Sequence, residues 1–330
     1  MKASAKANPN FALVKYWGKR DEKLKLPQNS SISLTVSDFF THTTIEFSEK
    51  YERDELVLNK KKYLPKNKEY ENIKEFLNQA RKISGTSLRA KVVSKNNFPT
   101  SAGFASSASG FSALATAVNQ ALSLKLGKKG LSILARMGSG SASRSIFSGF
   151  SEWKKGKKKD GSDCFAVQLK DNNYWNDIRI IACIISKKKK SIKSRKAMRE
   201  TVKTSPMYGC WLENIENDLE KTRHAIEKKD FSLLGKTAEH NCLKMHSLMW
   251  TTIPPIIYQE PKTIEIIKKV FEMRDNGLEC YFTMDAGPQV KILCLRRSVP
   301  AIIENILGIA KERFVLKPGR GARVSQNHLF

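Results

Sequence analysis

Residues 97–109 form a candidate phosphate site, reading NFPTSAGFASSAS. The segment joins a strand-like stretch at residues 88–93 to a helical pattern that includes Phe111. Pro99 restricts one backbone angle, Gly103 permits angles closed to other residues, and the Ala and Ser side chains let a ligand approach the backbone. Free N–H groups at a helix start, the helix dipole and nearby hydroxyls favour a phosphate. The segment lacks the Gly-Lys-Ser/Thr ending of a Walker loop, and a helix start packed with small residues is the plainer interpretation.

Two lysines and two aromatic residues lie together near the amino end. After a short apolar strand, the chain places Lys15, Tyr16, Trp17 and Lys19 around the turn at Gly18. Two ammonium groups beside two rings suit a phosphate ester whose carbon skeleton lies against the rings. An amphipathic strand with lysines that reach into solvent would show the same pattern.

A second segment of small residues, residues 138–145, reads GSGSASRS. It presents hydroxyls and Arg144 within one turn, and a guanidinium can hold a carboxylate or phosphate by two parallel hydrogen bonds. Alone it reads equally well as a flexible loop. Two such segments in one domain, about 40 residues apart, favour a shared polyphosphate cleft more than either segment does alone.

Asp285 ends a strand-like stretch and precedes Gly287 and Pro288. A strand end before a Gly-Pro turn is a common position for catalytic carboxylates and for aspartates that simply form the turn. The local sequence alone favours the turn.

The net charge is extreme. The chain of 330 residues has 59 Lys and Arg against 32 Asp and Glu, a formal net charge of +27. This favours anionic partners such as nucleic acid, acidic lipid or a phosphorylated metabolite. Lysine runs occur at residues 60–62, 154–159 and 187–190, without an aromatic-interleaved stripe or zinc-finger spacing. We interpret the first two runs as solvated surface, and the third as part of a basic connection that either closes over an anion or is a solvated linker.

Six cysteines are widely spaced and form no Cys-x-x-Cys pair. They are typical of reduced core residues in a cytoplasmic protein. No apolar run is long enough for a signal peptide or a membrane span. We therefore expect a cytoplasmic protein without a membrane partner.

The pattern of elements predicts two domains. Strand-like segments dominate the first half, up to an apolar run at residues 178–185, and helical periodicity then predicts helices. We place the boundary near residue 185 and expect the end of the chain, residues 317–330, to be loosely ordered. The main expected helices are residues 69–83, 208–227, 231–250, 263–275 and 299–313.

Five ordered blocks resemble the GHMP kinase superfamily, and within it the mevalonate diphosphate decarboxylase family. The resemblance spans nearly the whole chain, and five blocks at compatible spacing are highly specific. Departures are small: the family more often has Leu at Phe104 and Asn at Gln289. The blocks are residues 15–19, 27–31, 97–109, 138–145 and 284–288.

The resemblance implies a two-lobed α+β fold. Residues 1–185 would form an N-terminal mixed α/β lobe with the phosphate-binding loop, and residues 186–330 a C-terminal ferredoxin-like lobe of helices and sheet. It also implies an ATP-dependent decarboxylase that phosphorylates the 3-hydroxyl of mevalonate 5-diphosphate and then releases phosphate and carbon dioxide, giving isopentenyl diphosphate for isoprenoid biosynthesis.

The resemblance further implies a role for each matching residue, with ATP and Mg²⁺ as cofactors and no assigned metal ligand. A carboxylate beside a polyphosphate has a raised pKa unless cations offset it, so Lys15 is the expected companion of Asp285. The expected catalytic residues are Asp285, Lys15 and Arg144. The expected substrate-binding residues are Tyr16, Trp17, Lys19, Ser139, Ser141, Ser194 and Arg195. The expected ATP-binding residues are Ser94, Asn96, Ser101, Ala102, Gly103, Ser106 and Ser107.

Several alternatives remain open at this point. A phosphomevalonate decarboxylase or a mevalonate 3-kinase of the same fold would look similar, although the Asp285 and Lys15 pair favours a decarboxylase and the many cations favour a diphosphate. From a different class, a nucleic-acid-binding protein would show salt-dependent affinity and would be indifferent to loss of Asp285. We expect a small-molecule substrate, no nucleic-acid partner and a homodimer.

Overall fold

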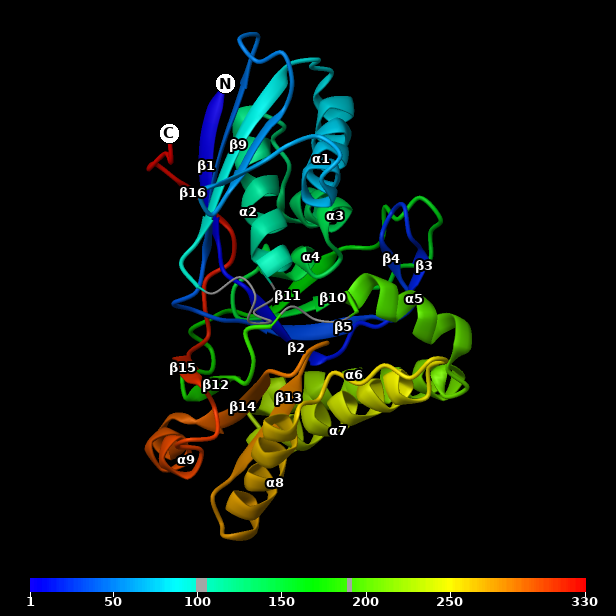
Figure 1. The fold of residues 1–330 in the computed structure, drawn as a ribbon, viewed down its shortest axis with the longest axis vertical. Helices are drawn as coiled ribbons and strands as arrows, with labels where there is room; N and C mark the ends of the chain where they lie inside the picture. Colours follow the sequence, from blue (N-terminus) through cyan, green and yellow to red (C-terminus); the bar gives the residue numbers. More distant parts are fainter. Residues whose placement is uncertain (99–105, 189–191) are drawn as a thin grey trace.

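The computed structural model describes residues 1–98, 106–188 and 192–330. Its upper lobe contains a six-stranded sheet in the order β16-β1-β6-β9-β7-β8, with α1, α2 and α3 beside it (Figure 1). β7 is parallel to β9, and the other pairs are antiparallel. The bounds are β1 Lys2–Ala7, β6 Thr41–Ser48, β7 Glu55–Leu58, β8 Lys61–Tyr63, β9 Arg89–Asn96, β16 Arg323–Ser325, α1 Lys68–Ser84, α2 Ser106–Ala121 and α3 Lys128–Gly138.

A four-stranded antiparallel sheet in the order β11-β10-β5-β2 lies between the upper lobe and the helices below (Figure 1). The short helix α4 packs beside it, and β3 and β4 form a separate ribbon. The bounds are β2 Asn10–Val14, β3 Lys19–Asp21, β4 Leu26–Pro27, β5 Ser31–Thr35, α4 Ala142–Ser145, β10 Phe150–Trp153 and β11 Ala166–Lys170.

The lower lobe combines long helices with an antiparallel sheet in the order β13-β14-β12-β15 (Figure 1). β12 pairs with β14 and β15, so the chain enters this sheet before the boundary that we expected at residue 185. The bounds are β12 Ile178–Ile184, α5 Ser194–Thr204, α6 Tyr208–Lys228, α7 Phe231–Trp250, α8 Pro261–Asp275, β13 Cys280–Met284, β14 Val290–Leu295, α9 Val299–Asn305 and β15 Glu312–Leu316, with a 3₁₀ turn at Arg296–Ser298.

One apolar core joins the two lobes. It includes Phe11 and Leu34 from the middle sheet and Trp211, Leu219 and Met245 from α6 and α7, all buried. Burial of this shared surface stabilises the packing of the lower helices against the middle sheet. The packed core therefore fixes the relative position of the elements that carry the residues between the lobes.

The long helices confirm the predictions from hydrophobic spacing. α1, α6, α7 and α8 each begin and end within two residues of the expected bounds. Local signals explain the ends: Asn67 accepts a hydrogen bond from the Glu69 N–H at the start of α1, and Gly85 ends the helix in the left-handed conformation. Asp230 caps α7 in the same way.

Two predictions for the end of the chain are wrong. The helix expected at residues 299–313 ends at Asn305, and Glu312–Leu316 forms β15. The tail expected to be loosely ordered instead crosses back to the upper lobe, where β16 pairs with β1. Gly319 is buried beside Val36 and exchanges backbone hydrogen bonds with Thr35 and Gly149.

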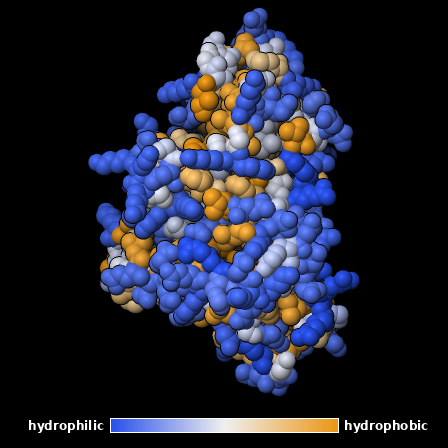
Figure 2. Space-filling view, turned by 180° about the vertical axis from the view of Figure 1, so that it is seen from behind, coloured by the Kyte–Doolittle hydropathy of each residue, from blue (hydrophilic) through white to orange (hydrophobic). Residues whose placement is uncertain are grey.

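Hydrophilic residues cover most of the face shown in Figure 2, with apolar groups between them. The lysines at residues 60–62 and 154–159 are exposed, which confirms the prediction that these runs are solvated. Among the helices of the described ranges, none is long and apolar enough to cross a membrane.

Gly319→Ala tests whether the tail is part of the folded structure. A Cβ atom there would lie 2.3 to 2.5 Å from backbone atoms of Val36 and Ser37, so we expect the free energy of unfolding to fall by about 1–3 kcal/mol. Gly209→Ala on α6, where a Cβ atom meets nothing within 4 Å, is the matched control. Equal stability of the two variants in urea unfolding would show that the tail does not pack as described.

Candidate active site

A cavity of about 570 Å³ lies between the lobes. It is lined by the segment after β2, the starts of α1 and α2, the segment around α4, the start of α5 and the turn after β13. Among the described residues of its lining, Lys and Arg outnumber Asp and Glu nine to three, which suits a ligand with several negative charges. The cations are Lys15, Lys19, Lys25, Lys68, Arg144, Lys193, Arg195, Lys196 and Arg199, and the acids are Glu22, Glu69 and Asp285.

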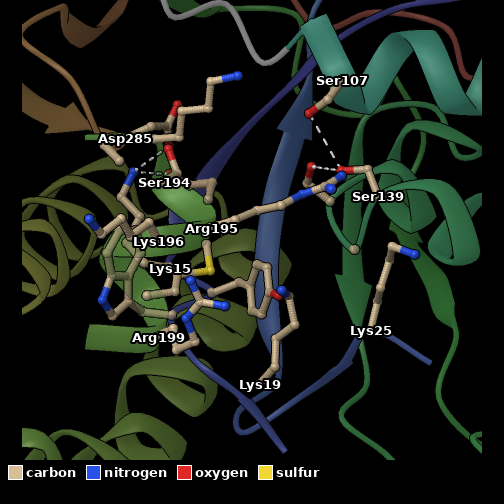
Figure 3. A pocket seen from close by; sticks show the side chains of 18 of the residues that line it. Lys15, Lys19, Lys25, Ser107, Ser139, Ser194, Arg195, Lys196, Arg199 and Asp285 are labelled. Carbon is tan, nitrogen blue, oxygen red and sulfur yellow. Dashed lines mark hydrogen bonds and ion pairs between the residues drawn. The ribbon is translucent and has the colours of Figure 1, made fainter. Parts of the chain in front are cut away.

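Asp285 lies on one side of this cavity, opposite Ser107 and Ser139 (Figure 3). Its two carboxylate oxygens each contact a different lysine: Oδ1 is 3.3 Å from Lys15 Nζ, and Oδ2 is 3.0 Å from Lys291 Nζ. Both lysine side chains are 2% exposed, whereas that of Asp285 is 32% exposed. Asp285 is thus a carboxylate that faces the cavity with both oxygens paired.

These contacts set the charge of Asp285. Burial would raise the pKa of this carboxyl, but Lys291 and Lys15 outweigh burial and hold the pKa well below its usual range. Asp285 is therefore ionised at neutral pH, and it can accept a hydrogen bond or a proton but has none to donate. We expected Lys15 to offset a raised pKa at Asp285. Lys15 does lower this pKa, but Lys291 lowers it as well.

The position of Lys15 is fixed through its own backbone. The Lys15 N–H donates to Asn241 Oδ1 at 2.7 Å, and the Lys15 carbonyl accepts from Asn29 Nδ2 at 2.8 Å. Asn241 in turn donates to Asp218 at 2.7 Å, and Lys15 Nζ donates to the Ala12 carbonyl at 2.7 Å. Burial lowers the pKa of Lys15, and Asp285 opposes that shift.

The turn after Lys15 depends on Gly18. Its φ angle is +92°, and a Cβ atom there would lie 1.9 Å from the Tyr208 hydroxyl. That hydroxyl donates to the Trp17 carbonyl at 2.9 Å, so α6 contacts the turn directly. The Tyr16 hydroxyl is buried without a partner among the described residues, and Lys19 Nζ lies 2.5 Å from Glu22.

Arg144 is 3% exposed and lines the cavity from α4. Its Nε donates to Ser33 at 2.9 Å and to Asn10 at 3.2 Å, and its Nη1 donates to Ser31. Within the described ranges Nη2 has no hydrogen bond, and it is available to a ligand. Burial lowers the pKa of Arg144 to about 10, opposed by Asp285 and Tyr16, so the guanidinium stays charged at neutral pH.

Serine hydroxyls gather where α2 begins. Ser106 and Ser107 are its first two residues, and both line the cavity. Ser139 lies 3.4 Å from Ser107 and 3.4 Å from Ser141, measured between the hydroxyl oxygens (Figure 3). The two small-residue segments therefore meet in one place, as the sequence predicts.

Helix α5 brings basic residues to the lining of the cavity. Ser194 and Arg195 are its first two residues, and both line the cavity. Arg195 reaches the upper lobe, where it donates to Asn72 Oδ1 at 3.1 Å and to the Gly138 carbonyl at 3.4 Å. The basic connection between the lobes thus contacts the candidate site.

Some expected ATP-binding residues lie elsewhere. Ser94 and Asn96 are on β9, outside the cavity lining, where Ser94 pairs with Thr43 at 2.8 Å and Asn96 accepts from Thr41 at 2.7 Å. Ser101, Ala102 and Gly103 lie outside the described residues, so their expected role stays a prediction. The cavity brings together the other expected site residues, which are Lys15, Tyr16, Trp17, Lys19, Ser106, Ser107, Ser139, Ser141, Arg144, Ser194, Arg195 and Asp285.

Sequence reasoning missed Lys291 at this site. A signal was present, because Lys291 interrupts the apolar strand VKILCL of β14, and a lysine within a buried strand needs a partner. The register of β13 and β14 places Lys291 opposite Thr283, two residues before Asp285. Lys25, Lys68 and Arg199 of the lining were also not predicted, whereas Lys196 belongs to the basic connection between the lobes that was considered as an anion contact.

The fold and the site define a two-lobed α+β protein of the GHMP kinase class, and comparisons with known proteins specify the family. The Diphosphomevalonate decarboxylase-like N-terminal domain matches residues 7–166, and the Mevalonate 5-diphosphate decarboxylase C-terminal domain matches residues 180–317. Diphosphomevalonate decarboxylase of Saccharomyces cerevisiae is 37% identical over 307 residues, covering 89% of this chain and 78% of the yeast protein.

Solved structures agree with the sequence comparison. Mevalonate diphosphate decarboxylase of Staphylococcus aureus superposes with a TM-score of 0.94 at 40% identity over 98% of each chain. The Enterococcus faecalis enzyme superposes with a TM-score of 0.92 at 40% identity over 99% of each chain. A complex of MDDEF with MVAPP, AMPPCP and magnesium superposes with a TM-score of 0.93 at 41% identity over 99% of each chain. This chain belongs to the diphosphomevalonate decarboxylase family.

Asp285→Asn is expected to lower the free energy of unfolding at neutral pH by about 3 kcal/mol, the lower end of the cost of leaving a buried charge unpaired. Loss of Asp285 would lower the pKa of Lys15 further. The unfolded chain then binds more protons than the folded variant, so the stability of the variant rises with pH. We therefore expect the deficit to shrink between about pH 7 and pH 10, as measured by urea unfolding.

Glu312→Gln provides the control, since it breaks the pair with Lys187, which is 55% exposed. The unfolding free energy of Glu312→Gln should be lower than that of the wild type by less than about 1 kcal/mol at every pH. If the loss of unfolding free energy in Asp285→Asn is constant or grows with pH, then Asp285 does not stabilise the charge of the buried Lys15.

Proposed function

We propose that this protein catalyses the ATP-dependent decarboxylation of mevalonate 5-diphosphate to isopentenyl diphosphate. The observation that carries the proposal is an ionised Asp285, opposite paired serines in a strongly cationic cavity, within a chain of this family. A phosphate-rich substrate with one reacting hydroxyl needs this combination. The serines and cations hold the phosphates, and the carboxylate faces the hydroxyl.

We infer that Asp285 orients the tertiary 3-hydroxyl and accepts its proton as the oxygen bonds to the γ-phosphorus of ATP. The bond between the γ-phosphorus and the bridging oxygen to the β-phosphate breaks in the same step, and ADP leaves. The 3-phosphate then departs, and the carbon–carbon bond to the carboxylate breaks to give carbon dioxide and the alkene. Arg144, whose Nη2 has no hydrogen bond to the described residues, holds the substrate carboxylate or the adjacent phosphate during these steps.

The 5-diphosphate group would bind the cationic and hydroxyl groups on the other side of the cavity. Tyr16, Lys19, Ser139, Ser141, Ser194 and Arg195 are the proposed contacts, and Trp17 shapes the turn that carries Lys19. The unpartnered Tyr16 hydroxyl supports this assignment, because a phosphate oxygen would satisfy it.

ATP would place its terminal phosphates at the start of α2, beside Ser106 and Ser107, with further contacts from residues 101–103. Ser94 and Asn96 lie outside the cavity lining, so they would contact a part of ATP that extends beyond it. Among the described residues there is no cluster of three metal-ligating side chains. Mg²⁺ is held largely by phosphates and water rather than by a cage of side chains, and Ser106 and Ser107 at the start of α2 would offer it hydroxyl oxygens. When bound, Mg²⁺ would neutralise part of the negative charge of the phosphates.

We further propose that the lobes divide between β11 and β12, because β12 pairs within the lower sheet and the tail returns to the upper one. The cytoplasmic location and the homodimer remain predictions.

The purified protein with ATP and mevalonate 5-diphosphate should release phosphate and carbon dioxide in equal amounts. The same assay with mevalonate and its 5-phosphate should give little turnover, because fewer cavity cations are engaged. Release of ADP without carbon dioxide would reassign the protein as a 3-kinase, and preference for the 5-phosphate would reassign the substrate.

Asp285→Asn should reduce turnover by at least about 100-fold, the scale of a positioned acid or base, while ATP and substrate still bind with near-normal affinity in calorimetry. Lys269→Met, which removes a half-buried lysine paired with Glu272 outside the cavity lining, is the matched control and should retain full turnover. Near-normal turnover of Asp285→Asn would remove this carboxylate from the mechanism.

A further inference from the structure

Lys291 is buried beside the candidate site but lies outside the cavity lining. Its Nζ is 3.0 Å from Asp285 Oδ2 and 5.1 Å from the centroid of the Phe11 ring. Lys15 differs, because it contacts the other oxygen and lines the cavity. The two lysines therefore approach one carboxylate from different sides.

This asymmetry matters when phosphates enter the cavity. An ammonium group that faces the cavity can interact with both Asp285 and an incoming phosphate. It then stabilises the ionised carboxylate less, although the phosphate charge favours protonation of Asp285. Lys291 has no such competitor, since its side chain is 2% exposed and does not line the cavity. A neutral side chain would also cost less to bury in β14 than an ammonium group, so a stable strand alone does not require this lysine.

We propose that Lys291 is a positioning residue that keeps Asp285 ionised during the reaction, leaving Lys15 to interact with the substrate. The proposal rests on the proposed decarboxylase function and adds to it a division of roles between two lysines. Lys291 acts through the carboxylate and does not touch the reacting atoms.

Several other groups surround the carboxylate. Arg144 of α4 lies across the cavity, close enough to interact with Asp285. On α7, Cys242 and His246 are both buried, and burial raises the pKa of the Cys242 thiol and lowers the pKa of His246 to about 3. Both α7 groups are therefore neutral at working pH. The permanent charges facing Asp285 from the described elements are Lys15, Lys291 and Arg144.

The test is the pH dependence of kcat in Lys291→Met and Lys291→Gln. Methionine keeps the length without the charge, and glutamine keeps a hydrogen-bond donor. With one counterion removed, Asp285 takes up a proton at higher pH, so the ratio of wild-type to variant kcat should rise at least about tenfold between about pH 8 and pH 6 in both variants. Lys269→Met, which removes a half-buried lysine of the same lobe that does not contact Asp285, should show a constant ratio.

A ratio independent of pH in both variants would overturn the proposal, because a purely structural loss lowers kcat equally at all pH values. A wild-type profile in Lys291→Gln with a shifted profile in Lys291→Met would also overturn it, since a hydrogen bond rather than the charge would then be responsible. Circular dichroism at each pH confirms that the variants are folded.

A second measurement needs no substrate, so it separates this proposal from the proposed function. The ion pair stabilises the folded wild type above the ordinary carboxyl pKa, and this stabilisation disappears as Asp285 is protonated. The difference in unfolding free energy between wild type and Lys291→Met should therefore narrow as the pH falls through about 4. A difference that is unchanged by acid would contradict the role of Lys291 even if the decarboxylase assay succeeds, whereas failure of that assay alone would contradict only the proposed function.

Discussion

The site depends on one electrostatic arrangement, in which a carboxylate is held between two buried ammonium groups. Burial lowers the pKa of Lys15 and Asp285 opposes that shift, while burial would favour a protonated Asp285 without the two lysines. The arrangement leaves one excess positive charge, to which Arg144 adds another. The cavity is thus suited to a highly anionic ligand, whose phosphates would balance this positive charge.

The fold brings this arrangement together from both lobes. Lys15 follows β2 of the middle sheet, whereas Asp285 and Lys291 come from the turn and strand of the lower sheet. Asn241 of α7 accepts from the Lys15 N–H. A second contact between the lobes, Glu152 with Arg223 at 2.9 Å, supports the same geometry. Because the lobes share an apolar core, the elements that make these polar contacts are held in fixed relative positions.

Periodicity and small-residue motifs predict much of this from sequence. The long helices have apolar residues at helical spacing and clear caps, and the blocks around Lys15, Ser139 and Asp285 mark the cavity. Periodicity does not show which sheet a strand joins, and for this reason β12 was expected in the upper lobe. The polar, basic tail looked loosely ordered because its stability comes from pairing with β1, at the other end of the chain. Lys291 was missed because an isolated lysine in a strand shows nothing of its partner until the register of β13 and β14 is known.

The most direct measurement of the central claim is a pH titration of the Asp285 carboxyl carbon by ¹³C NMR, assigned by comparison with Asp285→Asn. The account predicts the chemical shift of an ionised carboxylate from about pH 8 down to pH 4, with protonation beginning below the ordinary aspartate value of about 3.9. A midpoint at or above that value would contradict the claim that two lysines hold this carboxylate in its charged form.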